Sequence, residues 1–558
     1  MASPVSPQVT YPGVYIQEVA SGSSTITGVA TSITAFVGRT LMGPMGPTEP
    51  PMHCFSYAEF ERHFGGRSYD YPLSYAVEDF FQNGGSHAVI VRVTGTDPHS
   101  PSSPPGSSGD AAAKARVSIP AAGPLKLEAA SAGAWANDRL AVSVDASPSS
   151  SGSPPGPPRL IDQAAERFKR YGVDPDDLFN LTLKYTRPDG QVVTERHVNL
   201  TVKNAPNRID RVLKANSRLA VVALDPTDPA ATPVLGASSP AATTALPFTG
   251  GSDGPPLTTN NFKDLVGHPD AHTGIYALDK VDLFNLMCIP WDERGQDVPL
   301  EIYQKAADYC VKRRAMLVVD PPVAWRQHAF NGDFASIQPT DLDINGLQAR
   351  NCAVYFPKVI KPDDEMGGTP DVFPACGIIA GVMATTDASR GVWKAPAGIN
   401  AGIAGIVGLE GNITDAQNGM LNQLGINCLR NFPVIGPVVW GARTLRGADL
   451  LSDDYKYVPV RRLTLFIEES LYRGTQFAVF EPNDETLWSH LRLTIGTFMA
   501  DLARQGAFYG YQVTCDKTTT TPDDIDHGIV NVRVAFAPVK PAEFVVLFIQ
   551  QLAGQAAS

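Results

Sequence analysis

The chain has 558 residues, of which 43% are hydrophobic and 18% are charged, and its formal net charge at pH 7 is −12. The length predicts three or four compact units, and the hydrophobic content excludes a disordered chain. The acidic balance argues against a general nucleic-acid binder, which needs a basic surface to displace counterions. The low charge content predicts either that much of the surface is buried against partners or that the domains are large.

Cysteine usage and the chain's start predict the compartment in which the protein is made. The seven cysteines are dispersed and none forms a CxxC pair, which is typical of reduced, buried thiols in a cytoplasmically made protein. Residues 1–7 have neither a basic start nor an apolar run, so we expect no signal peptide. The most apolar window, residues 372–384, is too short to span a bilayer, so we expect a soluble protein without direct membrane insertion.

The first elements along the chain predict an α/β domain. Residues 32–38 and 88–93 are short apolar runs of strand type. Between them, a helical pattern at about 74–82 ends at an Asn-Gly-Gly sequence, which is typical of a helix C-terminus.

Three stretches rich in Pro, Ser, Gly and Ala follow, at residues 97–113, 147–158 and 225–256. Such composition is typical of linkers and exposed loops. Within the region they bracket, two β-rich runs flank the dipeptide Asp189-Gly190, which predicts a β-hairpin. We therefore expect a surface insertion with its own small sheet.

The pattern of strand, helix and strand then returns. Residues 283–290 and 315–322 are apolar runs that end at proline, and a helical pattern at 301–313 lies between them. This spacing predicts a βαβ unit and a partly parallel sheet.

The C-terminal part predicts an α+β unit. Asn483 is the expected N-cap of a helix whose first turn carries two carboxylates. Gly506 is expected to end this helix, and two strands follow, at residues 509–514 and 529–536. The apolar stripe of the helix contains Leu487, Trp488, Leu491, Ile495, Phe498, Met499 and Leu502.

The chain ends with an apolar, strand-forming run at residues 544–550. Such a run at a terminus favours aggregation unless another strand pairs with it. We therefore predict that residues 544–550 are unpaired within their own subunit and complete the sheet of another copy of the chain.

Fragments of catalytic or metal-binding patterns occur, but none is complete. His268 and His272 have metal-like spacing without a third ligand, and residues 250–254 are glycine-rich but lack the lysine of a phosphate-binding loop. Asp523, Asp524, Asp526 and His527 are expected to form a solvated turn, with a cation site as the alternative. No GxSxG or HExxH pattern occurs. The sequence thus predicts no catalytic, cofactor or metal site.

Several short sequences occur together in one order along the chain. They are Tyr-Pro-Gly-Val-Tyr-Ile-Gln-Glu-Val at residues 11–19, Ala-Phe-Val-Gly at 35–38, the segments 391–398, 425–430 and 439–444, an arginine-rich and aromatic block at 461–485, and Pro-Ala-Glu-Phe at 541–544. Together they resemble the contractile tail sheath proteins of myophages, tailocins and phage-tail-like injection systems. The insertion at 97–256 carries no such match.

The resemblance implies a structural subunit that polymerises as helical hexameric rings around an inner tube. It implies that extended arms add strands to neighbouring subunits, and that contraction drives the tube through a target envelope without a cofactor. The N-terminal arm would contain Gly13, Val14, Tyr15, Ile16, Gln17, Glu18 and Val19. The C-terminal arm would contain Phe544, Val545, Val546, Leu547, Phe548, Ile549 and Gln550.

The expected fold is mixed α/β and α+β, with several domains. The inner α+β domain would be formed by both chain ends, next to a middle α/β domain and a β-rich outer insertion. The expected units are an N-terminal arm at 1–22, a middle domain at 23–96 with 257–424, the insertion at 97–256, an inner, tube-facing domain at 425–540 and a C-terminal arm at 541–558.

The expected partners are other copies of the chain, an inner tube protein, and baseplate and terminal cap proteins, without nucleic acid. Arg492 and Arg504 lie off the apolar stripe and are candidates to face the tube, whereas Arg461 and Arg462 either bridge to a neighbouring ring or belong to the domain framework. The protein would be made in a bacterial cytoplasm and join a phage tail or tail-like injection particle.

Two other function classes remain open at this point. One is an α/β enzyme that binds a nucleotide or substrate near Asp320. The other is a different structural polymer, such as a tail tube or a surface layer.

Overall fold

The structure is a computed structural model that describes residues 25–45, 49–95, 112–120, 125–146, 167–225, 232–257 and 262–548. The chain divides into two compact units. Of the described residues, the first unit holds 30–462 and the second holds 25–29 with 463–548. The division falls within helix α10 (Val458–Gly474).

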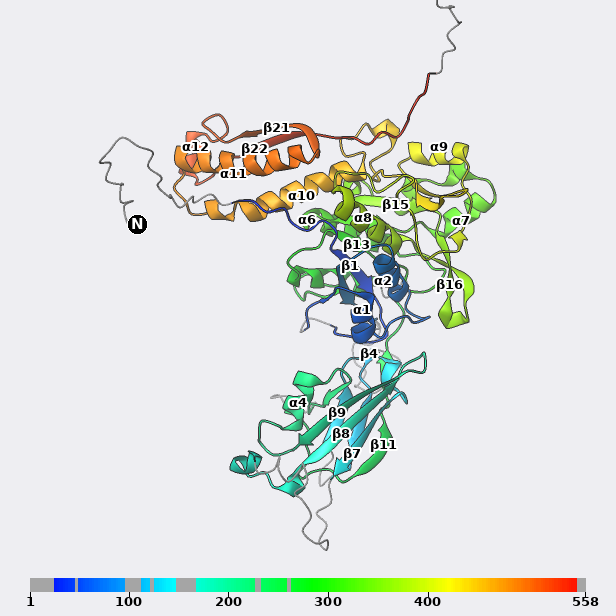
Figure 1. Cartoon of the computed structure of the whole chain (residues 1–558), viewed down its shortest axis with the longest axis vertical. Coiled ribbons are helices and arrows are strands. Elements are labelled where there is room, and N and C mark those ends of the chain that lie inside the picture. The colour runs from blue at the N-terminus through cyan, green and yellow to red at the C-terminus, as the bar shows by residue number, and fades with distance from the viewer. Residues whose placement is uncertain are drawn as a thin grey trace, which may run out of the picture. The chain divides into compact units, whose positions relative to one another are not determined.

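An eight-stranded sheet forms the centre of the first unit, in the order β2-β3-β1-β13-β14-β15-β19-β20 (Figure 1). Strands β3 to β19 in this order pair in parallel, and β2 and β20 are antiparallel edges. The strands are β1 (Thr34–Gly38), β2 (Met52–Cys54), β3 (Ala88–Arg92), β13 (Leu286–Cys288), β14 (Met316–Val319), β15 (Cys352–Phe356), β19 (Asn427–Phe432) and β20 (Gly436–Val439). The predicted βαβ unit is confirmed, because β13 and β14 pair in parallel on either side of α6 (Leu300–Lys312) in sequence.

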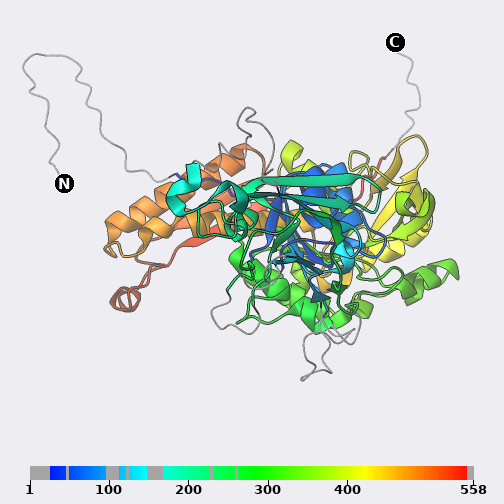
Figure 2. The same ribbon diagram turned by 90° about the horizontal axis from the view of Figure 1, so that it is seen from below.

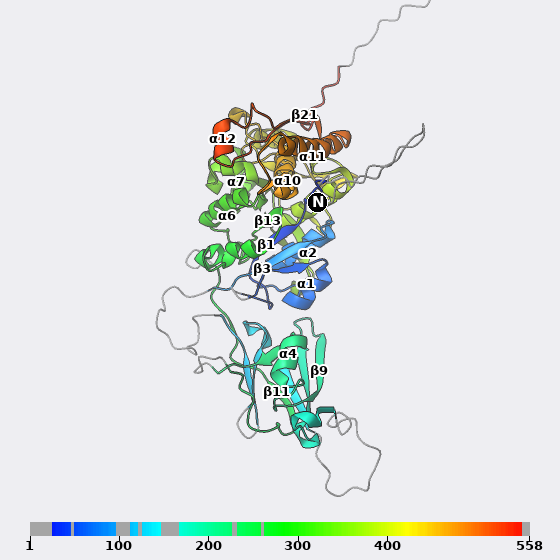
Figure 3. The ribbon, with the colours of Figure 1, turned by 90° about the vertical axis from the view of Figure 1, so that its left-hand side faces the viewer.

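Helices cover both faces of this sheet, as parallel pairing requires. On β1, Ala35 and Val37 belong to one hydrophobic core and Phe36 to the other. The first core includes side chains of α5 (Phe262–Val266), α6 and α7 (Val323–Phe330), and the second includes side chains of α1 (Tyr57–Phe64), α2 (Leu73–Gln82) and α8 (Cys376–Arg390). Figure 3 shows α1 and α2 on one side of β1 and β3, and α6 on the other.

Two glycines allow α8 to pack closely against α2. A Cβ atom added at Gly377 would lie 2.0 Å from the carbonyl oxygen of Ala76, and one added at Gly381 would lie 2.7 Å from that of Phe80. No side chain larger than hydrogen fits at either position without moving backbone. Most of the apolar window noted in the sequence, residues 372–384, thus forms the buried first part of α8. None of the described helices is long and apolar enough to cross a membrane.

The segment between β3 and β13 folds into small sheets of its own. A four-stranded sheet, β11-β7-β8-β9, and a three-stranded sheet, β10-β6-β5, enclose one hydrophobic core. The predicted hairpin is confirmed, since β8 and β9 pair as antiparallel strands on either side of Asp189-Gly190. The elements are β4 (Ala112–Ala113), β5 (Arg116–Ile119), β6 (Leu125–Ala129), β7 (Leu140–Ala146), β8 (Phe179–Thr186), β9 (Val192–Leu200), α4 (Ile209–Asn216), β10 (Ala220–Val222), β11 (Thr243–Pro247) and β12 (Ser252–Asp253).

The second unit contains the last part of α10, α11 (Glu485–Arg504), β21 (Phe508–Thr514), α12 (Pro522–Asp526) and β22 (Arg533–Pro538). The predicted apolar stripe of α11 is confirmed, because all seven of its side chains are buried. In Figure 1 and Figure 2, α11 lies beside α10. Within this unit the two helices run antiparallel, since Phe466 packs on Phe498 and Phe477 packs on His490.

Two local predictions in this unit were wrong. The N-cap of α11 is Asp484, whose carboxylate accepts hydrogen bonds from the N–H groups of Thr486 and Leu487. The side chain of Asn483 instead accepts a hydrogen bond from the indole of Trp488. The last strand begins at Arg533 rather than at residue 529, because the Ile529 carbonyl accepts a hydrogen bond from the Asn483 side chain and not from a partner strand.

The division of the chain differs from the expected boundary at residue 425. Strands β19 and β20 lie beyond that residue, yet they extend the central sheet of the first unit, where β19 pairs in parallel with β15. All seven cysteines are buried and free, as the sequence predicted.

We expect Gly377→Ala to lower the free energy of unfolding of the first unit by about 1–3 kcal/mol, because the added methyl group forces α2 and α8 apart. Urea denaturation followed by circular dichroism measures this change. Gly419→Ala in α9 (Asp415–Gln423) is the matched control, since nothing lies within 4 Å of a Cβ atom there. The control should raise stability by about 0.5–1 kcal/mol. Equal effects at the two positions would contradict the close packing.

Candidate functional site

Residues 25–29, here called the N-terminal strap, lie along α10 in the second unit. The N–H of Val29 donates to the Ser470 hydroxyl at 3.2 Å. A Cβ atom added at Gly28 would lie 2.7 Å from the Phe466 ring, and one at Gly474 would lie 2.6 Å from the Ile26 side chain. The strap therefore enters beside the last turn of α10 and runs antiparallel to the helix. The predicted N-terminal arm, residues 13–19, lies outside the described residues.

Strands β21 and β22 form a two-stranded antiparallel sheet. Neither strand pairs with a third one in the part of the chain that the structure describes. Both outer edges therefore keep backbone N–H and C=O groups that have no strand partner there. An isolated two-stranded sheet is only marginally stable in water, so this sheet is suited to accept further strands.

The segment that follows β22 is extended and exposed. Residues 541–548 form no helix or strand. Five consecutive apolar side chains, from Phe544 to Phe548, are between 70% and 93% exposed. Ile549 and Gln550, the last two residues of the predicted C-terminal arm, lie outside the described residues. Strand addition by this arm stays a prediction.

The four arginines singled out from the sequence have partners within the chain. Arg492 forms an ion pair with Glu485 at 2.6 Å, and Arg504 forms one with Asp501. Arg462 is buried and bonds to both carboxylate oxygens of Asp387, at 2.8 and 2.6 Å, and Arg461 donates to the side chain of Asn351. Arg461 and Arg462 thus contact the framework of the first unit, and a tube-facing role for Arg492 and Arg504 stays a prediction.

The motif fragments make ordinary structural contacts. His268 Nδ1 lies 3.9 Å from Asp270 Oδ2, and His272 Nδ1 lies 3.6 Å from Asp279 Oδ2. Asp524 accepts a hydrogen bond from the N–H of Thr521 in the capping box of α12. Among the described residues, no group of three or more potential ligands is placed to hold a metal ion.

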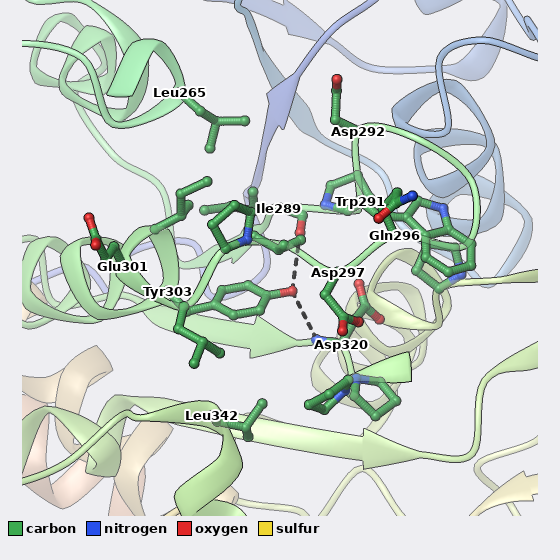
Figure 4. Close-up of a pocket in the computed structure, with 18 of the residues that line it drawn as sticks. Leu265, Ile289, Trp291, Asp292, Gln296, Asp297, Glu301, Tyr303, Asp320 and Leu342 are labelled. Carbon is green, nitrogen blue, oxygen red and sulfur yellow. Dashed lines mark hydrogen bonds between the residues drawn. The ribbon is translucent and has the colours of Figure 1, made fainter. Parts of the chain in front are cut away.

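A cavity of about 700 Å³ lies at the carboxyl edge of the central sheet (Figure 4). Residues that follow β13 and β14 form its floor, and the first turn of α6 forms one wall. Figure 4 shows Tyr303 reaching from α6 toward Asp320. The Tyr303 hydroxyl donates to the Ile289 carbonyl at 3.4 Å and accepts from the Asp320 N–H at 3.3 Å. Ligands of open α/β sheets bind at this edge.

Charged side chains are buried at the floor of this cavity. The Asp320 carboxylate accepts hydrogen bonds at 3.0 Å from the N–H groups of Ala375 and Cys376 through Oδ1, whereas Oδ2 has no hydrogen-bond partner in the described chain. Burial raises the pKa of Asp320 to about 6. The Lys358 ammonium lies 4.4 Å from the centre of the Trp291 ring, and burial lowers its pKa.

Sequence reasoning singled out Asp320 but missed Lys358, Trp291 and the contacts of the strap at Gly28 and Gly474. Lys358 follows β15 as Asp320 follows β14, so its position after a buried strand was an available signal. Gly28 and Gly474 give no such signal, because their role depends on side chains that are hundreds of residues away in sequence.

Comparison with known proteins identifies two matching family models. The phage tail sheath protein central domain matches residues 266–445, and the phage tail sheath C-terminal domain matches residues 452–551. Together they cover just over half of the chain. A tail sheath protein of Vibrio phage KVP40 is 30% identical over 175 residues, which are 31% of this chain and 26% of that protein. The matched part thus spans about a quarter of that relative.

Solved structures show the same fold over almost the whole chain. The helical sheath of the anti-feeding prophage in its contracted state covers 97% of this chain and 99% of that chain, with a TM-score of 0.54 and 21% identity. The sheath complex of an extracellular contractile injection system, PVC, in the contracted state also covers 97% of this chain and 98% of that chain, with a TM-score of 0.52 and 20% identity. The mixed α and β architecture is therefore shared with sheath proteins.

We expect Asp320→Asn to raise stability at pH 7.5 by up to roughly 3 kcal/mol, because it keeps the Oδ1 acceptor and removes a buried charge. The folded pKa of about 6 lies above the reference value of 3.8. The stability contributed by protonated Asp320 is therefore complete below pH 3.8 and lost as the pH rises through about 6. Urea denaturation at pH 5 and 7.5 should show the smaller difference at pH 5. Asp320→Ala is the control and should be destabilised at both pH values.

Proposed function

Because the chain belongs to the phage tail sheath family, we propose that it is a structural subunit of a contractile sheath. The subunits polymerise as helical hexameric rings around an inner tube, and contraction drives that tube through a target envelope. The other partners are baseplate and terminal cap proteins. The protein is made in a bacterial cytoplasm and joins a phage tail or tail-like injection particle. It acts mechanically, without catalysis or a cofactor.

The observation that carries this proposal is the exposed apolar segment, Phe544 to Phe548, which follows a sheet that has two strands in the described part of the chain. Burial of five large apolar side chains contributes about 10 kcal/mol, and ordering five residues costs about 5–10 kcal/mol. These terms nearly cancel, so main-chain hydrogen bonds to an open sheet edge decide whether the segment binds. Strand addition to the hairpin of a neighbouring subunit supplies those bonds.

The positions of the two terminal segments support a polymer rather than a closed pair. The strap enters the second unit next to Gly474, near the start of α11, whereas the chain leaves β22 at Pro538, which pairs with Phe508 near the end of α11. A helix of 20 residues is about 30 Å long. Arms that leave opposite ends of one unit reach different neighbours, and such heterologous contacts generate helical assemblies.

In this proposal the energy for contraction is stored when the extended sheath is built. The extended lattice is then a kinetically trapped state. A free-energy difference of about 1 kcal/mol per subunit in favour of the contracted lattice is typical of a single side-chain contact. Summed over all coupled subunits, it makes contraction strongly favourable. The arms keep neighbouring subunits connected while the lattice changes its diameter.

Deletion of residues 544–558 is expected to abolish sheath assembly and to leave a folded monomer, because residues 544–548 contribute no strand to their own subunit. Negative-stain electron microscopy detects the tubular polymers, and circular dichroism with size-exclusion chromatography monitors the monomer. Val546→Pro provides a smaller change, since it removes one N–H donor and one exposed side chain. It should reduce assembly strongly without changing the melting temperature.

Phe330→Ser is the matched control, because this aromatic side chain is 86% exposed and lies on α7, outside the arm. It should assemble like the unchanged protein. Normal tubes from the truncated chain would show that the C-terminal arm is not the connecting strand. Tubes of a single length and diameter, with no separate inner tube, would instead favour a tail tube or a surface layer.

A further inference from the structure

The cavity at the carboxyl edge of the central sheet contains polar groups that the fold does not satisfy. Trp291 Nε1 and Asp320 Oδ2 are buried and have no hydrogen-bond partner in the described chain. The Lys358 side chain, which also lines the cavity, is only 4% exposed. Buried polar groups are normally hydrogen-bonded, so two unsatisfied atoms beside a buried ammonium group require an explanation.

Lys358 is the most unusual of the three. No carboxylate oxygen of the described chain lies within 4.0 Å of its ammonium group, whose contact is the face of the Trp291 ring. The side chain borders both the 700 Å³ cavity and a second cavity of about 450 Å³. A buried ammonium normally requires a hydrogen-bonded anion. Asp320, Asp297 and Glu410 act on this ammonium group through longer-range charge interactions, so a ligand that enters the cavity supplies the closely paired anion.

The neighbouring groups restrict the chemistry of such a ligand. Lys358 and Trp291 are hydrogen-bond donors, whereas Asp320 Oδ2 is an acceptor. A ligand that satisfies all three carries a negatively charged acceptor and a donor close together. The lining around them is apolar and aromatic, with Ile289, Tyr303 and five prolines, so it suits a small organic molecule.

The rim of the cavity excludes strongly anionic ligands. It carries Glu293, Asp297, Glu301 and Asp343, and Figure 4 shows Asp297 beside Asp320. Polyphosphates are repelled by these carboxylates and require the cationic or glycine-rich loops that this site lacks. A ligand with one carboxylate and a nearby N–H group meets much less repulsion.

We propose that this cavity binds an α-carboxylate with an adjacent N–H donor, the chemistry shared by free amino acids and the C-termini of peptides. The carboxylate pairs with the Lys358 ammonium, and the N–H group donates to Asp320 Oδ2. The cavity volume of about 700 Å³ accommodates a single amino acid or the last few residues of a chain. The two sources are distinguished by experiment.

Isothermal titration calorimetry with the full-length chain tests the proposal. The probes are the twenty free amino acids, acetyl-Ala-Ala-Ser, which has the sequence of residues 556–558, and the same tripeptide with an amidated end. We expect saturable binding, with a Kd below about 1 mM, of at least one free amino acid or of the peptide acid. Which of the two binds identifies the source. The amidated peptide should bind at least tenfold more weakly than the acid.

Lys358→Met should weaken binding at least tenfold, and Lys312→Met, on the exposed surface of α6, should leave it unchanged. Should Lys358→Met fail to fold, the amidated peptide and the amides of the amino acids give the same comparison, because they remove the carboxylate from the ligand. Absence of binding at 10 mM of every probe would overturn the proposal. Equal binding by acids and amides would also overturn it.

Discussion

The second unit contains a sheet that has two strands in the described part of the chain, fewer than a sheet needs to be stable on its own. Strands β21 and β22 pair with each other along one edge each. Among the described residues no strand pairs with their outer edges, so the backbone groups there need water or another strand. In the isolated subunit these edges coexist with the exposed apolar segment 544–548. Both features are unfavourable alone, and in the proposed sheath each compensates the other where copies meet. In that proposal, the hydrogen-bonding requirement that shapes a single domain also favours assembly of many subunits.

The two hydrophobic cores of the first unit are formed by its own residues. Its parallel sheet is covered by helices on both faces, and two glycines set the spacing between α2 and α8. Its cavity lies at the edge where parallel α/β sheets generally bind ligands, although the family is a structural one. Fold alone does not determine function, so a structural protein can have a ligand-sized cavity at the carboxyl edge of its parallel sheet.

Local sequence patterns predicted helices, strands and turns well. The pairing of distant strands and the composition of the cavity depend on long-range contacts, which such patterns do not contain. The apolar stripe of α11, the βαβ unit around α6 and the hairpin at Asp189-Gly190 follow from spacing and turn chemistry. The N-cap was misplaced by one residue because Asn and Asp are equally good caps and the indole of Trp488 engages Asn483. That β19 pairs with β15, or that Lys358 lies against Trp291, depends on segments far apart in sequence.

The N-terminal strap has a mechanical consequence. It lies lengthwise on α10, with Ile26 against Gly474 and Gly28 against Phe466. A tensile load applied at residue 25 along the helix axis would shear these contacts together instead of breaking them one at a time. Shear loading distributes the force over all of the contacts. The close packing at each glycine resists sliding, because the facing side chain would have to move past the backbone. Gly28 and Gly474 thus help to set the tensile force that the contact between the strap and α10 withstands.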